Sequence, residues 1–195
     1  MVFMNQLDVL VIGNLKRSED GSILDANSTS TLIKADGRLI VVDTSTVRMR
    51  PAIKVSFKQI GVFMKDVDTV ILTHMHHDHA ENTDLYPNAE VYVHSGDENI
   101  PSGYNVVDSD TEIADGVRLV HTPGHTLDSM SVFVHGDGMR YVIAGDAIPL
   151  KDNCTKMLPP AVNISKELSI KSIKTITNFA DVIIPGHGQP FMTGR

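Results

Sequence analysis

The stretch VILTHMHHDHAEN, residues 70–82, decides which fold this chain can adopt. It places four histidines and one aspartate within the six residues from His74 to His79, directly after an apolar run. His74 and His76 are two residues apart, so they point to the same side of an extended chain. Asp78 and His79 follow where the chain is expected to turn into a helix. Because neutral imidazole and carboxylate are ligands for Zn, Fe and Mn, the stretch predicts a metal site rather than a solvated turn.

Three later segments repeat one pattern, in which an apolar strand is followed by small or turn residues and then by one side chain that can bind a metal. They are VHTPGHT with His125, VIAGDA with Asp146 and VIIPGHG with His187. A strand holds the side chain at its end rigidly, and a neighbouring glycine lets the backbone approach closely. Independent strands that end in this way predict that their terminal side chains meet at one site.

The remaining sequence predicts alternating strands and helices. Asp-Gly pairs at 36–37, 115–116 and 137–138 separate apolar runs and predict hairpin turns with positive φ angles. Residues 51–66 have an apolar stripe of helical period that ends at Met64, and residues 165–180 have a second stripe with Ser165 as the N-cap. A short helix is expected to begin near Asp78. These elements favour a layered α/β domain in which helices cover sheets.

Composition narrows the class of protein. A chain of 195 residues fits one domain spanning residues 1–195, and a net charge of −7 without a long basic run disfavours tight nucleic-acid binding. The single cysteine, Cys154, excludes an intrachain disulfide and fits a reducing compartment. The first residues resemble neither a signal peptide nor a membrane span, so we expect a cytoplasmic protein without membrane contact.

The spacing of these side chains resembles the signature of the metallo-β-lactamase superfamily. The resemblance covers nearly the whole chain and implies an αββα sandwich, with two mixed sheets covered by helices and a metal site at one edge. It implies a set of ligands in which one metal is held by His74, His76 and His125, a second by Asp78, His79 and His187, and Asp146 bridges the two.

Such a centre implies a specific chemistry. Two divalent ions, Zn first and Fe or Mn as alternatives, lower the pKa of a shared water and provide a bridging hydroxide. Asp78 is the expected catalytic side chain among the ligands. Asp43 is expected either to orient a histidine or to act as a cap or turn residue, and His77 is expected to lie at the rim of the pocket. Cys154 is not expected to react.

Departures from individual families narrow the substrate. The best-known β-lactamases have Cys where this chain has Asp146, and flavodiiron oxygen reductases have Glu where it has His76. The stretches LYPNAEVYVHSGD and ADVIIPGHGQPF are similar to those of the small group named metallo-β-lactamase-domain-containing protein 1. We expect hydrolysis of a small ester, thioester or lactone. The alternatives are cleavage of a phosphodiester, including RNA, and metal binding without significant turnover.

Several segments are candidates for the substrate pocket. Loops at 15–28 and 45–52 and the stretch 151–163 are expected to form its walls. Arg48 and Arg50 either bind a substrate anion or are solvated charges before a helix. His121 either lines the pocket or bonds to the backbone. We expect a small-molecule substrate, and a homodimer is one option for the oligomeric state.

Overall fold

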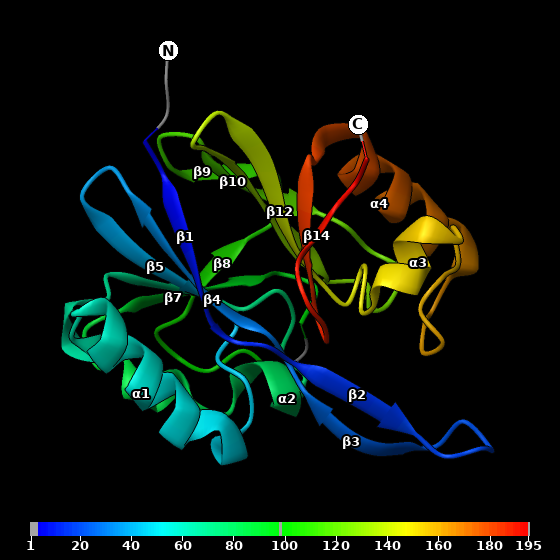
Figure 1. Ribbon diagram of the computed structural model, residues 1–195, viewed down its shortest axis with the longest axis horizontal. Helices are drawn as coiled ribbons and strands as arrows, with labels where there is room; N and C mark the ends of the chain where they lie inside the picture. Colours follow the sequence, from blue (N-terminus) through cyan, green and yellow to red (C-terminus); the bar gives the residue numbers. More distant parts are fainter. Residues whose placement is uncertain (1–3, 98, 195) are drawn as a thin grey trace.

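The computed structural model describes residues 4–97 and 99–194, and within them it contains two six-stranded sheets and a separate two-stranded hairpin (Figure 1). The first sheet has the spatial order β1 (Gln6–Val11), β4 (Ser30–Ala35), β5 (Arg38–Val42), β6 (Thr69–Ile71), β7 (Glu90–His94) and β8 (Asn105–Val107). The second has the order β14 (Phe191–Met192), β13 (Val182–Pro185), β12 (Met139–Gly145), β11 (Met130–Gly136), β10 (Val117–His121) and β9 (Thr111–Ala114). The hairpin consists of β2 (Asn14–Arg17) and β3 (Ile23–Asn27), and the helices are α1 (Arg50–Ile60), α2 (His77–Ala80), α3 (Lys151–Thr155) and α4 (Lys166–Phe179).

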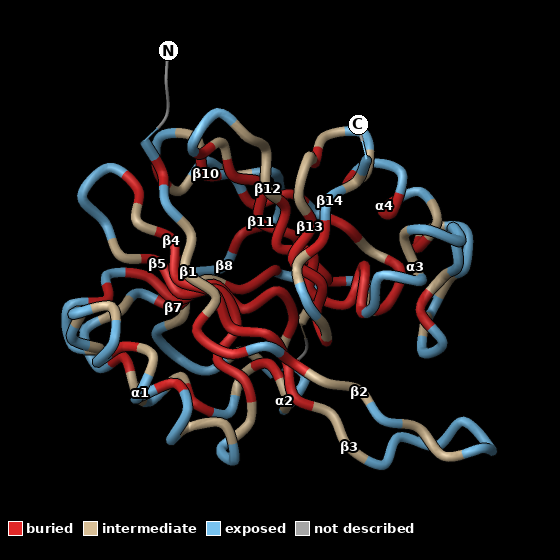
Figure 2. Tube along the Cα trace, viewed as in Figure 1, coloured by how far each residue is buried: buried red, intermediate tan, exposed pale blue. Residues whose placement is uncertain are grey.

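The two sheets pack face to face because alternate residues of their strands enter different apolar layers. In β5, Ile40 belongs to the layer between the sheets, whereas Val41 packs in the layer that contains α1. In β11, Val132 lies between the sheets and Phe133 packs in the layer that contains α4. The buried residues therefore gather in the middle of the molecule, with helices outside (Figure 2). The predicted αββα sandwich is confirmed.

Parallel pairing directs several strand ends to the same edge of the sandwich. β5, β6 and β7 are parallel neighbours in the first sheet, and β12 and β13 are parallel in the second. The carboxyl ends of parallel strands lie at one edge of a sheet, where the following loops begin. The segments that carry the predicted ligands follow β6, β12 and β13, and a further one follows β10.

The helices agree with the sequence in position but not always in length. α4 begins after Ser165, whose hydroxyl accepts a hydrogen bond from the Leu168 amide at 3.2 Å, so the predicted N-cap is confirmed. The prediction of one helix to residue 66 was wrong, because α1 ends at Gly61, which has a φ of 71°. A 3₁₀ turn, Met64–Asp66, follows separately. Similarly, the short helix expected near Asp78 is split into α2 and a 3₁₀ turn at Thr83–Leu85.

Two of the three Asp-Gly turns have the predicted backbone. Both residues have positive φ angles at 36–37 and at 137–138, as type I′ hairpins require. At 115–116 only Gly116 has a positive φ, and the pairing of β9 with β10 shifts register beside it. The third turn is therefore a hairpin turn of another type.

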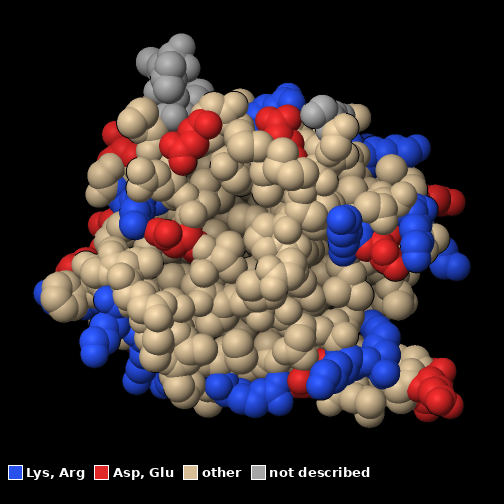
Figure 3. All heavy atoms as spheres, viewed as in Figure 1, with Lys and Arg blue, Asp and Glu red and all other residues tan. Residues whose placement is uncertain are grey.

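The segment expected to be a loop at residues 15–28 is instead mostly the β2–β3 hairpin, which projects from the body of the sandwich (Figure 1). On the face shown in Figure 3, lysine and arginine side chains lie around the margin with acidic side chains between them. Among the described residues, every helix is too short or too polar to cross a lipid bilayer.

Replacing Ser165 with Ala is expected to lower the free energy of unfolding by about 1 kcal/mol, because the Leu168 amide loses its cap. The measurement is the urea midpoint at constant m-value. Thr175→Ala in the same helix is the control, since the Thr175 hydroxyl bonds only back to the Lys171 carbonyl at 3.1 Å. Equal losses in the two variants would contradict the capping role of Ser165.

Candidate metal centre and active-site pocket

Side chains from four segments of the chain meet at the edge where the strands end. Their possible ligand atoms form groups in which all atoms lie within 4.8 Å of one another. The groups are His74, His76 and His125; His74, His79 and Asp146; and Asp78, His79 and His187. All seven side chains that the sequence singled out as ligands are therefore brought together.

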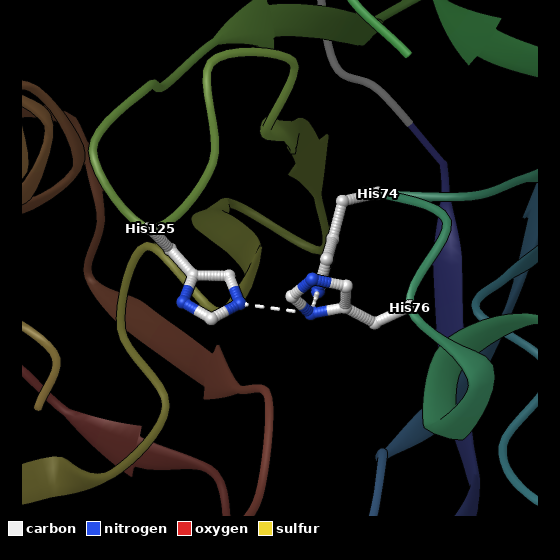
Figure 4. A group of neighbouring side chains, drawn as sticks. All are labelled: His74, His76 and His125. Carbon is white, nitrogen blue, oxygen red and sulfur yellow. Dashed lines mark hydrogen bonds between the residues drawn. The ribbon is translucent and has the colours of Figure 1, made fainter. Parts of the chain in front are cut away.

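The first group is made of three imidazoles that converge from two loops (Figure 4). His74 Nε2 lies 3.0 Å from His76 Nδ1, and His125 Nε2 lies 3.1 Å from the same nitrogen. His74 and His76 follow β6, and His125 lies in the loop after β10. Three ring nitrogens that point at one position are a typical donor set for a zinc ion.

Asp146, which follows β12, lies between the first group and the third. Its Oδ2 is 3.5 Å from Nε2 of His125. Its Oδ1 is 3.2 Å from Nε2 of His187 and 3.5 Å from Nε2 of His79. One carboxylate oxygen thus faces each group, which is the geometry that a shared ligand requires.

The outer nitrogens of the rings are held by the protein. His79 Nδ1 lies 2.7 Å from Oδ2 of Asp43. The Thr73 hydroxyl donates to the same oxygen at 2.9 Å, and the Thr73 amide donates to Oδ1 of Asp43 at 2.8 Å. Asp43 is 1% exposed and therefore acts inside the site, not as a surface cap. Of the two roles predicted for Asp43, the structure shows the one that orients a histidine.

Backbone carbonyls hold two further rings. His125 Nδ1 donates to the Val162 carbonyl at 2.8 Å, and His187 Nδ1 donates to the Asn27 carbonyl at 2.9 Å. Because Nδ1 of each ring carries the hydrogen, Nε2 keeps a free electron pair and faces the site, where it can bind a metal. Sequence reasoning missed Val162 and Asn27, because a backbone acceptor can be any residue.

Two buried atoms of the site have no hydrogen-bond partner among the described residues. They are His79 Nε2 and Asp146 Oδ1, and they face the same space. An unsatisfied buried polar atom costs about 1–3 kcal/mol, so such a pair fits a site built for a cation. Gly186 permits the arrangement, since a Cβ there would lie 2.2 Å from Asp146 Oδ1. The residues present therefore fit a bound metal.

The histidines differ in pKa because their surroundings differ. Burial, together with neighbouring imidazoles, lowers the pKa of His74 well below its usual value and also lowers the pKa of His76. Burial also acts to lower the pKa of His79, but Asp43 and Asp146 outweigh it and raise that pKa well above its usual value. The pKa of His187 is raised because Asp146 outweighs burial. Burial raises the pKa of Asp146, but His187 and His79 outweigh it and hold that pKa well below its usual value.

A cavity of about 640 Å³ opens above these groups. One wall is the β2–β3 hairpin, with Leu15, Arg17, Ile23 and Ala26. The opposite wall consists of Leu150 and the predicted stretch 151–163, represented by Leu158 and Val162. His77 lines the cavity as an exposed residue, in agreement with its predicted place at the rim. The volume suits a small-molecule substrate.

Three candidates for the pocket lie elsewhere. Arg48 pairs with Asp25 behind the hairpin, and Arg50 donates to Asn82 at 2.9 Å and to Asp84 at 2.5 Å. His121 stacks on His94, and its Nε2 lies 2.7 Å from the Leu127 carbonyl. The backbone bond predicted as one alternative for His121 is therefore found, whereas the two arginines are neither in the cavity nor simply solvated, because each forms an ion pair. Among the described residues that line the cavity, the arginine is Arg17. It lies in the predicted segment 15–28 but was not singled out there, because only the hairpin geometry orients it.

Comparisons with known proteins agree with this geometry. Residues 24–94 match the Metallo-beta-lactamase superfamily. A Methanocaldococcus jannaschii protein named "probable metallo-hydrolase" is 38% identical over 169 residues, which are 87% of this chain and 80% of that protein. The chain belongs to the metallo-beta-lactamase superfamily. Metallo-beta-lactamase domain-containing protein 1 of Xenopus laevis is 33% identical over 88% of this chain and 75% of its own length, so the predicted resemblance to this group is confirmed.

The fold is shared with solved members of the superfamily. The crystal structure of a quorum-quenching N-acyl homoserine lactone hydrolase has a TM-score of 0.77 and 21% identity, over 96% of this chain and 93% of that one. Together with the relatives above, these relationships identify the chain as a metal-dependent hydrolase.

In the metal-free protein, His79 and His187 are expected to titrate above the usual histidine pKa, and His74 and His76 below it. The first pair is then protonated up to a higher pH than the second. NMR titration of the ring protons measures this. Asp43→Asn removes the charge beside His79 and should lower the pKa of that ring. Asn tolerates the φ of 55° at this position.

Asp66→Asn, which neutralises an exposed carboxylate remote from the rings, is the control. Should both variants leave the His79 pKa unchanged, Asp43 does not set the protonation of that ring.

Proposed function

We propose that this chain is a two-metal hydrolase that cleaves a small ester, thioester or lactone. The observation that carries the proposal is the arrangement of two groups of possible metal ligands, with Asp146 between them, at the floor of a largely apolar cavity. His74, His76 and His125 would hold one ion, and Asp78, His79 and His187 the other, with Asp146 shared. Zn is the expected metal, with Fe or Mn as alternatives, because imidazole and carboxylate donors suit all three.

Two such ions would supply a hydroxide nucleophile at neutral pH and would polarise the substrate carbonyl. The protein contributes orientation and proton transfer. Asp78 is the proposed catalytic residue, because its carboxylate lines the cavity beside His187, with Oδ2 3.6 Å from Nε2 of that ring. From there Asp78 can hold a proton and pass it to the leaving group. The apolar walls exclude water from the acyl part of the substrate.

A phosphodiester substrate is the less favoured alternative. Among the described residues that line the cavity, Arg17 is the only lysine or arginine, whereas four carboxylates line it: Asp78, Glu81, Asp146 and Asp152. A nucleic-acid backbone requires clustered cations. An N-acyl homoserine lactonase of a Bacillus species, which is 28% identical over 134 residues, supports an acyl substrate instead.

The purified protein reconstituted with Zn is expected to hold close to two ions per chain, by elemental analysis. Chelation should abolish hydrolysis, and Zn, Mn or Fe should restore it. The substrates to compare are thioesters, lactones, bis-p-nitrophenyl phosphate and short RNA. Faster turnover of the phosphodiesters would refute the proposed substrate class. Metal binding without turnover of any substrate would favour a binding protein.

Asp146→Ala is expected to lose both ions, because it removes the shared carboxylate. Asp78→Asn should keep the ion of the three-histidine group while lowering kcat by about 100-fold or more. Asp152→Asn is the matched control, since it neutralises a carboxylate of the same cavity that pairs only with Lys156. Full activity in Asp78→Asn, or loss of a single ion in Asp146→Ala, would contradict these assignments.

A further inference from the structure

The hairpin wall of the cavity presents one face to the substrate. Leu15 pairs with Ala26 and Arg17 pairs with Ile23 across the two strands. Residues paired across a hairpin share a face, and these four are the hairpin residues that line the cavity. The opposite face carries Lys16 and Asp25, which lie opposite one another across the two strands. The hairpin therefore separates two arginines, with Arg17 facing the cavity and Arg48 bound to Asp25 behind it.

Along this face, successive residues of the hairpin lie further and further from the possible metal ligands. At the base of the hairpin, the Asn27 carbonyl accepts the hydrogen bond from His187, and Asn27 pairs with Asn14. Leu15 and Ala26 come next, and Arg17 and Ile23 lie further towards the tip. Three residues of strand from Asn14 to Arg17 span about 10 Å. The wall is thus apolar beside the donor groups and cationic further out.

The charge of Arg17 is available to a ligand. Its Nη1 donates to the Gly21 carbonyl at 2.8 Å, and no carboxylate among the described residues pairs with it. The outer carboxylates of the cavity are engaged elsewhere, because Glu81 accepts from the Val47 amide at 2.8 Å and Asp152 pairs with Lys156 at 2.7 Å. The opposite wall near the mouth is apolar, with Leu158 and Val162.

We propose that Arg17 selects acyl substrates that carry an anionic group at the far end of an apolar segment. This inference rests on the proposed function of the site. The scissile carbonyl would lie at the donor groups, the apolar segment between the hairpin and the stretch 158–162, and the carboxylate or phosphate at the guanidinium. Arg17 is then a specificity-determining residue that acts mainly on KM, because its contact is made equally in the bound substrate and in the transition state.

The test compares mono-p-nitrophenyl suberate with p-nitrophenyl octanoate, whose acyl chains have the same length and differ in the terminal carboxylate. The metal-loaded wild-type protein should prefer the suberate. Arg17→Met should lower the ratio of kcat/KM for suberate over octanoate about fivefold to tenfold at low salt, mostly through KM. Arg17→Lys should retain part of the preference, and added salt should reduce it.

Lys16→Met is the matched control, because it removes the same charge from the other face of the same strand. Equal changes in the two variants would show a general effect of charge and overturn the proposal. Hydrolysis of both esters by the wild-type protein without a preference for suberate would overturn it as well. A p-nitrophenyl ester with a terminal phosphonate in place of the carboxylate distinguishes the two kinds of anion. The anion whose ester shows the larger Arg17-dependent preference over octanoate is the one that the site binds.

Calorimetric binding of suberate and octanoate separates this inference from the proposed function. If the wild-type protein hydrolyses neither ester but binds suberate more tightly in an Arg17-dependent way, the anion site stands and the proposed reaction is wrong. If both esters are hydrolysed and the two acids bind equally in wild type and Arg17→Met, the reaction stands and the anion site is wrong.

Discussion

The site depends on one constraint, which is that buried nitrogen and oxygen atoms need partners. His79 Nε2 and Asp146 Oδ1 are buried, face one another at 3.5 Å and have no hydrogen bond among the described residues. A packed interior tolerates this where a cation completes the bonding. Neighbouring residues hold these two atoms in place. Gly186 allows the backbone to approach Asp146, and Asp43 holds the outer side of the His79 ring.

The supports of the rings are also the walls of the pocket. His187 is held by the carbonyl of Asn27, at the end of the hairpin whose inner face lines the cavity. His125 is held by the carbonyl of Val162, whose own residue lines the opposite wall. A displacement of either wall would move the carbonyl that orients one of these rings. The same two segments therefore shape the cavity and orient two of the imidazole rings.

The possible metal ligands were predictable from the sequence because their pattern is local and chemically rare. Histidine and aspartate after apolar strands are visible in one segment at a time, and parallel strands bring such ends together. Features that arise from three-dimensional placement were not predictable. Arg48 and Arg50 stand out near the expected edge but bind Asp25 and Asp84, whereas Arg17 reaches the cavity only because residues 14–27 fold as a hairpin. The end of α1 was missed because Gly61, in a left-handed conformation, interrupts an apolar stripe that continues past it.

The pKa values of the histidines differ between the two halves of the centre. Asp43 and Asp146 lie inside the site, where both raise the pKa of His79 and Asp146 also raises the pKa of His187. Burial and neighbouring imidazoles instead lower the pKa values of His74 and His76, which favours the neutral ring, the state that binds a metal. A metal ion would therefore compete with protons up to a higher pH at His79 and His187 than at His74 and His76, which makes the two halves of the centre unequal although their side chains are similar.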